Sequence, residues 1–209
     1  MQSLIEHARQ FPARIAGQQD AYAALARGQR PQALFITCSD SRVVPSLITG
    51  ARPGDVFEVR TAGNIVPPWR PQAACAVGGS LEFALEALEV PNIVVCGHSH
   101  CGAVQGLLRE QDVRSMPLVR RWLTRAGHRT GQDGSAPSAD EELTPAVQRH
   151  VLTQLGHLRT YPCVARRLDS GRLRLHAWFY TVESGEVLSC AADGRTFRPR
   201  RPRRSFLTS

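Results

Sequence analysis

Two short motifs in this chain carry residue types that bind soft metal ions. The first is Cys38–Arg42, with the sequence CSDSR, and the second, about sixty positions further on, is Gly97–Gly102, with the sequence GHSHCG. Two thiolates and an imidazole form a ligand set that suits zinc, and three protein ligands leave the fourth position of a catalytic zinc ion open. The first motif adds an acid and a guanidinium close to its sulfur. The two motifs therefore predict a catalytic zinc centre.

The ring ligand could come from either histidine of the second motif, His98 or His100. Adjacent residues such as His100 and Cys101 tend to point in different directions, whereas residues three apart at the start of a helix can converge, so we favour His98. Taken alone, Cys38 would be interpreted as an inert buried thiol. Taken alone, the acid and arginine that follow it would be interpreted as an ordinary surface ion pair. The second motif, at the end of another strand, favours a metal site over an inert thiol and over a simple ion pair.

Each motif follows a run of apolar and β-branched residues that predicts a buried strand, over residues 33–38 and 92–97. The carboxyl ends of adjacent parallel strands share one crevice, which would bring the two motifs together. Residues 56–60 alternate as a further strand, and 173–182 with 186–191 predict a hairpin. We therefore predict an α/β fold with a central, mostly parallel β-sheet flanked by helices and a C-terminal antiparallel edge hairpin. Helices are expected near residues 3–12, 21–26, 45–48 and 73–88, from residue 102 and from residue 145, with an exposed connection over 127–142.

The length of 209 residues and the ordinary composition indicate a single catalytic domain over 1–194, with an N-terminal helical arm. Residues 195–209 form an Arg/Pro-rich tail that we expect to be disordered. Six arginines and no acid lie in this tail, so it carries six of the net +8 charges. We interpret it as a solvated terminus rather than a segment that binds an acidic partner, and nucleic acid is not expected as a partner.

The six cysteines are too few and too scattered to form a disulfide framework. Cys75, Cys96, Cys163 and Cys190 are interpreted as core thiols. No secretory signal is visible, and no apolar run approaches the roughly 20 residues that a membrane-spanning helix needs. These features predict a cytoplasmic protein with reduced thiols and no membrane span.

Five motifs together resemble the β-class carbonic anhydrases, over about residues 20 to 190. The motifs, in chain order, are Thr37–Arg42, Pro53–Asp55, Ala62–Asn64, Gly79–Glu82 and Cys96–Gly102. This resemblance implies a lyase that reversibly hydrates carbon dioxide to bicarbonate and a proton by means of a metal-bound hydroxide, with one Zn²⁺ per chain. It also implies self-association as a dimer or tetramer. Because zinc lowers the pKa of bound water to about 7, activity should rise between neutral and mildly alkaline pH.

The resemblance assigns roles to the residues of the two motifs. It implies that Cys38, His98 and Cys101 are the zinc ligands and that Asp40 and Arg42 form a catalytic dyad. Arg42 would hold the Asp40 carboxylate ionised and oriented through a bidentate pair. The resemblance also implies a closed state in which Asp40 leaves Arg42 and becomes the fourth zinc ligand.

Further residues are candidates for binding the substrate. Gln29, nine positions before Cys38, matches a glutamine that one branch of the family uses to hydrogen-bond the substrate across the dimer interface. Phe35 stands where the other branch has a tryptophan, so the resemblance is to the glutamine branch. The other candidates are an apolar wall made by Val43, Phe57 and Phe83, each of which, taken alone, is better explained as ordinary core, and Gly102, where a helix begins and backbone amides could face an anion. The chain departs from the family at Thr61, where asparagine is usual, and at Phe83, where many members have tyrosine.

Two other functions remain open from the sequence. The same metal site on this fold could hydrolyse carbon disulfide or carbonyl sulfide, because pocket access rather than the ligand set would separate these substrates. A protein of another class, a noncatalytic zinc protein whose basic tail binds a partner, is disfavoured by Asp40 and Arg42. A carbon dioxide hydration assay separates the enzyme from the binding protein.

Overall fold

The structure, a computed structural model, describes residues 1–127 and 139–199. The chain divides into two compact units, Met1–Arg30 and the part from Pro31 onward. The first unit consists of α1 (Gln2–Arg14), a 3₁₀ turn η1 (Ala16–Gln18) and α2 (Gln19–Leu25), and these elements bury no residue. Most of the connection expected over 127–142 lies outside the described residues, as do residues 200–209 of the expected tail.

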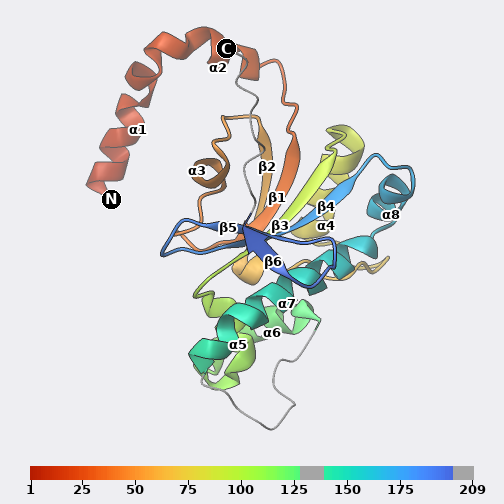
Figure 1. Cartoon of the computed structure of the whole chain (residues 1–209). Helices are drawn as coiled ribbons and strands as arrows, with labels where there is room; N and C mark the ends of the chain where they lie inside the picture. The colour runs from red at the N-terminus through yellow and green to blue at the C-terminus, as the bar shows by residue number, and fades with distance from the viewer. Residues whose placement is uncertain (128–138, 200–209) are drawn as a thin grey trace, which may run out of the picture. The chain divides into compact units, whose positions relative to one another are not determined.

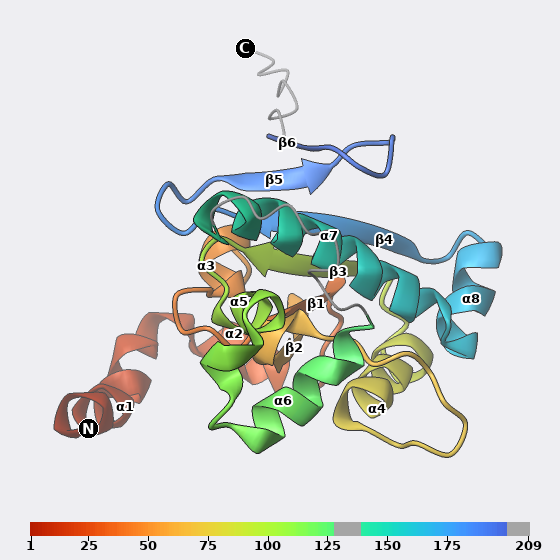
Figure 2. The same ribbon diagram turned by 90° about the horizontal axis from the view of Figure 1, so that it is seen from below.

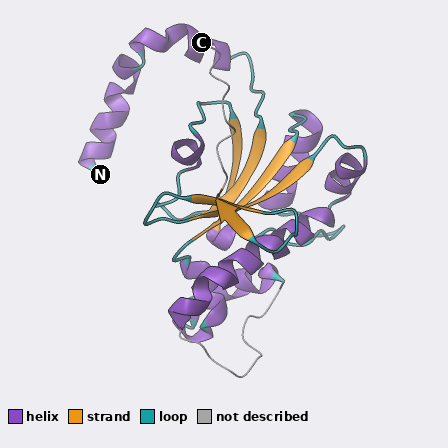
Figure 3. Ribbon diagram, viewed as in Figure 1, coloured by secondary structure: helices purple, strands orange, loops and turns teal. Residues whose placement is uncertain are grey.

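A six-stranded sheet forms the centre of the second unit (Figures 1 and 3). Its spatial order is β2 (Val56–Thr61), β1 (Ala33–Cys38), β3 (Asn92–His98), β4 (Arg174–Tyr180), β5 (Val187–Cys190) and β6 (Phe197–Pro199). The first four strands are mutually parallel, and the last two pair antiparallel. This arrangement confirms the predicted α/β fold with its mostly parallel sheet and C-terminal hairpin. The sheet also extends past residue 194, because β6 pairs with β5.

Helices and shorter helical turns connect the strands and cover the sheet (Figure 2). In chain order they are α3 (Pro45–Thr49), η2 (Ala62–Asn64), α4 (Ala76–Glu82) and the π-helical turn η3 (Phe83–Ala87) that continues it, α5 (Gly102–Leu108), η4 (Glu110–Val113), α6 (Pro117–Leu123), η5 (Thr124–Ala126), α7 (Ala139–Arg159) and α8 (Pro162–Asp169). The start of α7 lies before the predicted residue 145, so Pro145 stands inside the helix. None of the helices in the described ranges combines the length and apolar character needed to cross a bilayer.

The two central strands are buried on both faces, as their continuous apolar runs predict. On one face, Leu34, Ile36 and Val95 pack with apolar side chains of α4, α7 and α8 to form the main core. On the other face, Phe35 and Trp178 belong to a smaller cluster, with their ring centroids 5.7 Å apart in an edge arrangement. Both motifs are therefore carried by the most deeply buried part of the sheet.

Gly97 allows α7 to lie directly against β3. A Cβ atom at this position would stand 2.6 Å from Cγ1 of Val147 and 2.7 Å from Cγ2 of Val151. Because these contacts are shorter than the packed interior tolerates, the Gly97→Ala variant should lower the free energy of unfolding by about 1–3 kcal/mol, as measured by urea denaturation.

The matched control for this prediction is Gly156→Ala, in the exposed part of α7, where nothing lies within 4 Å of the added Cβ. Alanine is the better helix former there, so the control should raise the free energy of unfolding by about 0.5–1 kcal/mol. Equal denaturation midpoints for the two variants would contradict the close packing at Gly97.

Candidate metal centre

The structure brings the three predicted ligands together. Cys38 is the last residue of β1, His98 the last residue of β3, and Cys101 stands directly before α5. The two strands are parallel neighbours, with Thr37 opposite Cys96, so both motifs leave the sheet at the same edge. The two sulfur atoms and the ring nitrogen lie within 4.8 Å of one another, and all three side chains are buried. This spacing could hold a metal ion.

The His98 ring is oriented for coordination by its Nε2 atom. Its Nδ1 atom donates a hydrogen bond to the Ser99 carbonyl oxygen at 2.8 Å, since a carbonyl can only accept. Nε2 is then left as the unprotonated nitrogen, and it is buried with no hydrogen-bond partner among the described residues. A buried nitrogen without a partner costs free energy that a metal bond would offset. The donor set thus fits a metal.

The other histidine of the motif points elsewhere. The His100 side chain is 62% exposed, and its Nε2 atom lies 3.4 Å from Oε2 of Glu183. Glu183 also accepts a hydrogen bond from the Ser99 hydroxyl at 2.7 Å. Sequence reasoning gave Glu183 and Ser99 no role, because the contact joins residues that are far apart in the chain. Between the two ring candidates, the geometry favours His98.

The two thiols interact with each other. The hydrogen bond from the Cys101 thiol, together with donors such as the amide of Gly63 at 3.3 Å from its Sγ atom, lowers the pKa of Cys38. The same hydrogen bond and burial raise the pKa of Cys101. The pair therefore shares one proton, which a metal ion would release on binding both sulfurs. Glycine is the favoured residue at position 63, because the backbone φ there is 75°, in the left-handed region that other residues rarely adopt.

Asp40 and Arg42 form a bidentate pair at the mouth of this group. Nε and Nη2 of Arg42 donate to the two Asp40 carboxylate oxygens at 2.9 and 2.7 Å, and the Arg42 amide donates to Oδ1 at 3.0 Å. These bonds hold the pKa of Asp40 well below its usual range. Oδ2 of Asp40 lies 3.9 Å from Nε2 of His98. A permanently ionised acceptor thus stands beside the three ligands.

Arg60, on β2, holds the loop that carries Cys38 and Asp40. Its Nη2 atom donates to the carbonyl oxygens of Cys38 at 3.0 Å, Asp40 at 2.8 Å and Val43 at 2.7 Å, and its Nε atom donates to the Cys38 carbonyl at 3.2 Å. Sequence reasoning did not single out Arg60. Its role depends on the strand register, which sets it opposite Thr37.

Side chains of α7 support the segment that follows β2. His150 donates from Nε2 to the Gly63 carbonyl at 2.7 Å, and His157 donates from Nδ1 to the Val66 carbonyl at 2.7 Å. Gln154 binds the same segment by accepting from the Val66 amide at 2.9 Å. Because Gly63 contacts Cys38, the long helix positions one side of the metal group.

The candidate substrate residues are divided between different parts of the chain. Val43, directly after the first motif, is buried, and Gly102 is exposed as the first residue of α5. Phe57 stands opposite Leu34, at the end of β1 remote from Cys38, and its ring centroid lies 6.0 Å from that of Phe83. Register therefore keeps these two rings away from the metal group of their own chain. Gln29 is exposed in the N-terminal unit.

Comparison with known families gives a match over most of the second unit. A family described as carbonic anhydrase matches residues 33–187. A carbonic anhydrase of Synechocystis is 46% identical over 199 residues, which cover 93% of this chain and 72% of that protein. A carbonic anhydrase of Pseudomonas aeruginosa is 44% identical over 189 residues, covering 86% of each.

Solved structures give the same result at the level of the fold. The β-carbonic anhydrase CcaA superposes with a TM-score of 0.88 at 41% identity, covering 97% of this chain and 93% of that one. One of two β-carbonic anhydrases of Sordaria macrospora, described as tetrameric, superposes with a TM-score of 0.76 at 28% identity over 90% of this chain and 94% of that one. These similarities extend beyond the two motifs to nearly the whole chain.

Proposed function

Since this chain belongs to the β-carbonic anhydrase family, we propose that it catalyses the zinc-dependent, reversible hydration of carbon dioxide to bicarbonate and a proton. One observation carries the proposal. Two buried sulfurs and the unpartnered Nε2 of His98 converge beside an acid that an arginine keeps ionised. Zinc rather than a harder cation suits this set, because thiolates are soft ligands and no carboxylate oxygen is needed.

Cys38, His98 and Cys101 would hold the ion, one per chain. A zinc ion bound there would lower the pKa of a bound water to about 7, which makes a nucleophile available near neutrality. The hydrogen bond from Nδ1 of His98 to the Ser99 carbonyl fixes the ring so that Nε2 stays aimed at the ion. The amide of Gly63 does the same for the Cys38 sulfur.

Asp40 would accept a hydrogen bond from the nucleophile and so orient a lone pair of the nucleophile toward carbon dioxide. Its Oδ2 atom is on the side of His98, and Arg42 prevents the carboxylate from rotating freely. Because the pKa of Asp40 lies well below its usual range, the dyad stays ionised from pH 6 to 9. In the alternative closed state, the same carboxylate would leave Arg42 and take the fourth ligand position.

Substrate binding would involve residues of two chains. Val43 and Gly102 belong to the metal group's own surroundings, whereas Phe57 and Phe83 are remote from it in the same chain. Phe83 is 49% exposed and lies beside Phe57, and aromatic side chains are enriched at interfaces between proteins. We therefore propose self-association as a dimer or tetramer, in which Phe57, Phe83 and Gln29 serve the site of a second copy.

The test is a stopped-flow assay of carbon dioxide hydration on protein of measured zinc content. The rate should rise several-fold between pH 6.5 and 9, because the two thiolates donate more charge than neutral imidazoles and so move the deprotonation of the water above neutrality. Asp40, with its depressed pKa, cannot produce a change in this range. A rate that is flat or falls over this interval would contradict the proposal. So would hydrolysis of carbon disulfide without hydration of carbon dioxide.

A further inference from the structure

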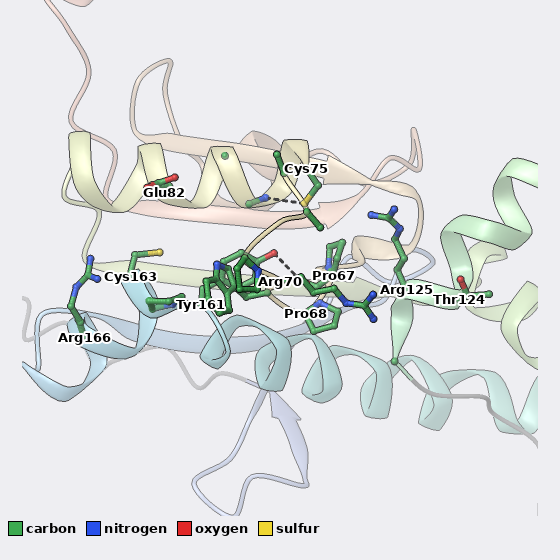
Figure 4. Close-up of a pocket in the computed structure, with 18 of the residues that line it drawn as sticks. Pro67, Pro68, Arg70, Cys75, Glu82, Thr124, Arg125, Tyr161, Cys163 and Arg166 are labelled. Carbon is green, nitrogen blue, oxygen red and sulfur yellow. Dashed lines mark hydrogen bonds between the residues drawn. The ribbon is translucent and has the colours of Figure 1, made fainter.

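A second pocket lies outside the metal group and shares no residue with it. It has a volume of about 830 Å³ and is formed by the loop after η2, the start of α4, the end of α6 with η5, and the start of α8 (Figure 4). Pockets of this size hold small organic molecules, and carbon dioxide or bicarbonate would fill only a small part of it. The carbonic anhydrase reaction gives this pocket no role.

The charges around the pocket are strongly unbalanced. Its lining includes four arginines, Arg70, Arg121, Arg125 and Arg166, and one acid, Glu82. Among these, Arg166 is neutralised by Glu86 at 2.8 Å, outside the lining. The other three guanidiniums form no ion pair with any residue whose side chain the structure describes, and Arg125 stacks on the Trp122 ring with 5.9 Å to its centroid. Three permanent positive charges therefore stand at this pocket with no counter-ion among the described side chains.

These charges gather toward one end. Figure 4 shows Thr124 and Arg125 at one end of the pocket, Glu82, Cys163 and Arg166 at the other, and Arg70 between them. The backbone of Arg121 adjoins the first end, because its carbonyl accepts a hydrogen bond from the Thr124 hydroxyl at 2.8 Å. The acid thus lies at the opposite end of the pocket from Arg125.

The apolar part of the pocket wall is a proline-rich loop that hydrogen bonds hold in place. Three prolines, Pro67, Pro68 and Pro71, fix the loop, and the Tyr161 hydroxyl donates to the Pro67 carbonyl at 2.8 Å. The Trp69 amide donates to the Thr160 hydroxyl at 2.9 Å, and 42% of the Trp69 residue surface is exposed. A pocket whose loop is held in this way loses little conformational entropy when it binds a ligand.

We propose that this pocket binds a small organic molecule bearing two or more phosphate groups. Guanidinium forks match the geometry of phosphate oxygens, and arginines on separate elements suit a ligand whose anionic groups are several ångströms apart. The proline and tryptophan surface would contact the carbon skeleton between those groups. The guanidiniums stay charged at all physiological pH values, so binding would not depend on protonation of the protein.

The experiment is isothermal titration of the full, zinc-loaded chain with fructose 1,6-bisphosphate as the probe, in sodium chloride buffer of fixed ionic strength. The double variant Arg121→Gln/Arg125→Gln should weaken binding by at least tenfold. Arg114→Gln, an exposed arginine outside the lining, is the matched control and should change the dissociation constant less than twofold. Arg70→Gln, in the loop, provides an independent variant and should also weaken binding.

Three results would overturn this inference. They are no measurable binding at millimolar probe, equal binding by the native protein and the double variant, and tighter binding of tricarballylate than of the bisphosphate, which would indicate a carboxylate site. A Cys101→Ala variant should bind the probe as the native chain does. Its result separates failure of the phosphate pocket from failure of the proposed metal chemistry.

Discussion

The Cys101→Ala variant is expected to lose stoichiometric zinc and to hydrate carbon dioxide at least about 10³-fold more slowly than the native protein. A metal ion supplies several kcal/mol of stabilisation to such a reaction, and each 1.36 kcal/mol corresponds to about a factor of ten. Cys101 is fully buried and provides one of only two sulfurs in the group. Its removal leaves two ligands, too few for a stable zinc site. Metal analysis and stopped-flow rates measure both effects.

The matched control for this variant is Cys96→Ala, which removes another fully buried thiol, from β3, the strand that ends at His98. Cys96 packs with Phe35 and Val94 and takes no part in the metal group. It should keep its zinc and retain activity within about threefold. Loss of zinc from both variants would mean that general destabilisation, rather than the missing ligand, explains the result. Full activity of the Cys101 variant would refute the assignment.

The Arg42→Ala variant is expected to keep its zinc but to lose about 10- to 100-fold in hydration rate, equivalent to about 1.4–2.7 kcal/mol. Both oxygens of Asp40 are held by Arg42, so its loss frees the carboxylate to rotate, and the closed state with Asp40 on the metal should become more populated. Arg42→Lys should recover only part of the rate, because an ammonium ion lacks the guanidinium fork. Arg52→Ala, an exposed arginine away from the dyad, should be neutral.

The pH profile of the Arg42→Ala variant distinguishes orientation from simple loss of structure. Arg42 lowers the pKa of Asp40, so removing the guanidinium should raise that pKa toward its ordinary value. Even the ordinary pKa of an aspartate, about 3.9, lies well below the range from pH 6.5 to 9, so the carboxylate of the variant should stay ionised there and the loss of rate should come from lost orientation. An Arg42→Ala enzyme with native rate and native zinc content would refute the dyad.

The sequence was sufficient for the α/β class and for the position of the metal group. Runs of apolar residues define β1 and β3, and each run ends directly at a motif, so the parallel arrangement alone requires the motifs to meet. The strand β6 was not predictable, because Phe197–Pro199 lies among arginines and prolines that are typical of an unpaired tail. The early start of α7 is not predictable either, because a proline such as Pro145 is typical of the first turn of a helix.

The roles that the sequence did not reveal depend on contacts between distant residues. Arg60 contacts three carbonyls only because β2 pairs with β1 in one particular register, and one arginine in an alternating strand carries no such signal. Phe57 and Phe83 were grouped with Val43 by residue type, but the register separates them from the site within one chain. The unpaired arginines of the second pocket come from a loop, a helix and a 3₁₀ turn, so no motif joins them.

The contacts of Arg60 have a consequence for how the enzyme would acquire its ion. One guanidinium ties three carbonyls of the Cys38–Val43 loop to the sheet, and none of these bonds involves a metal. We therefore expect the loop that carries Cys38 to keep its position without the ion, so that zinc uptake requires proton release from the thiols rather than refolding of this loop. Chelation should thus be reversible, yielding a folded apoenzyme that regains activity when zinc is returned.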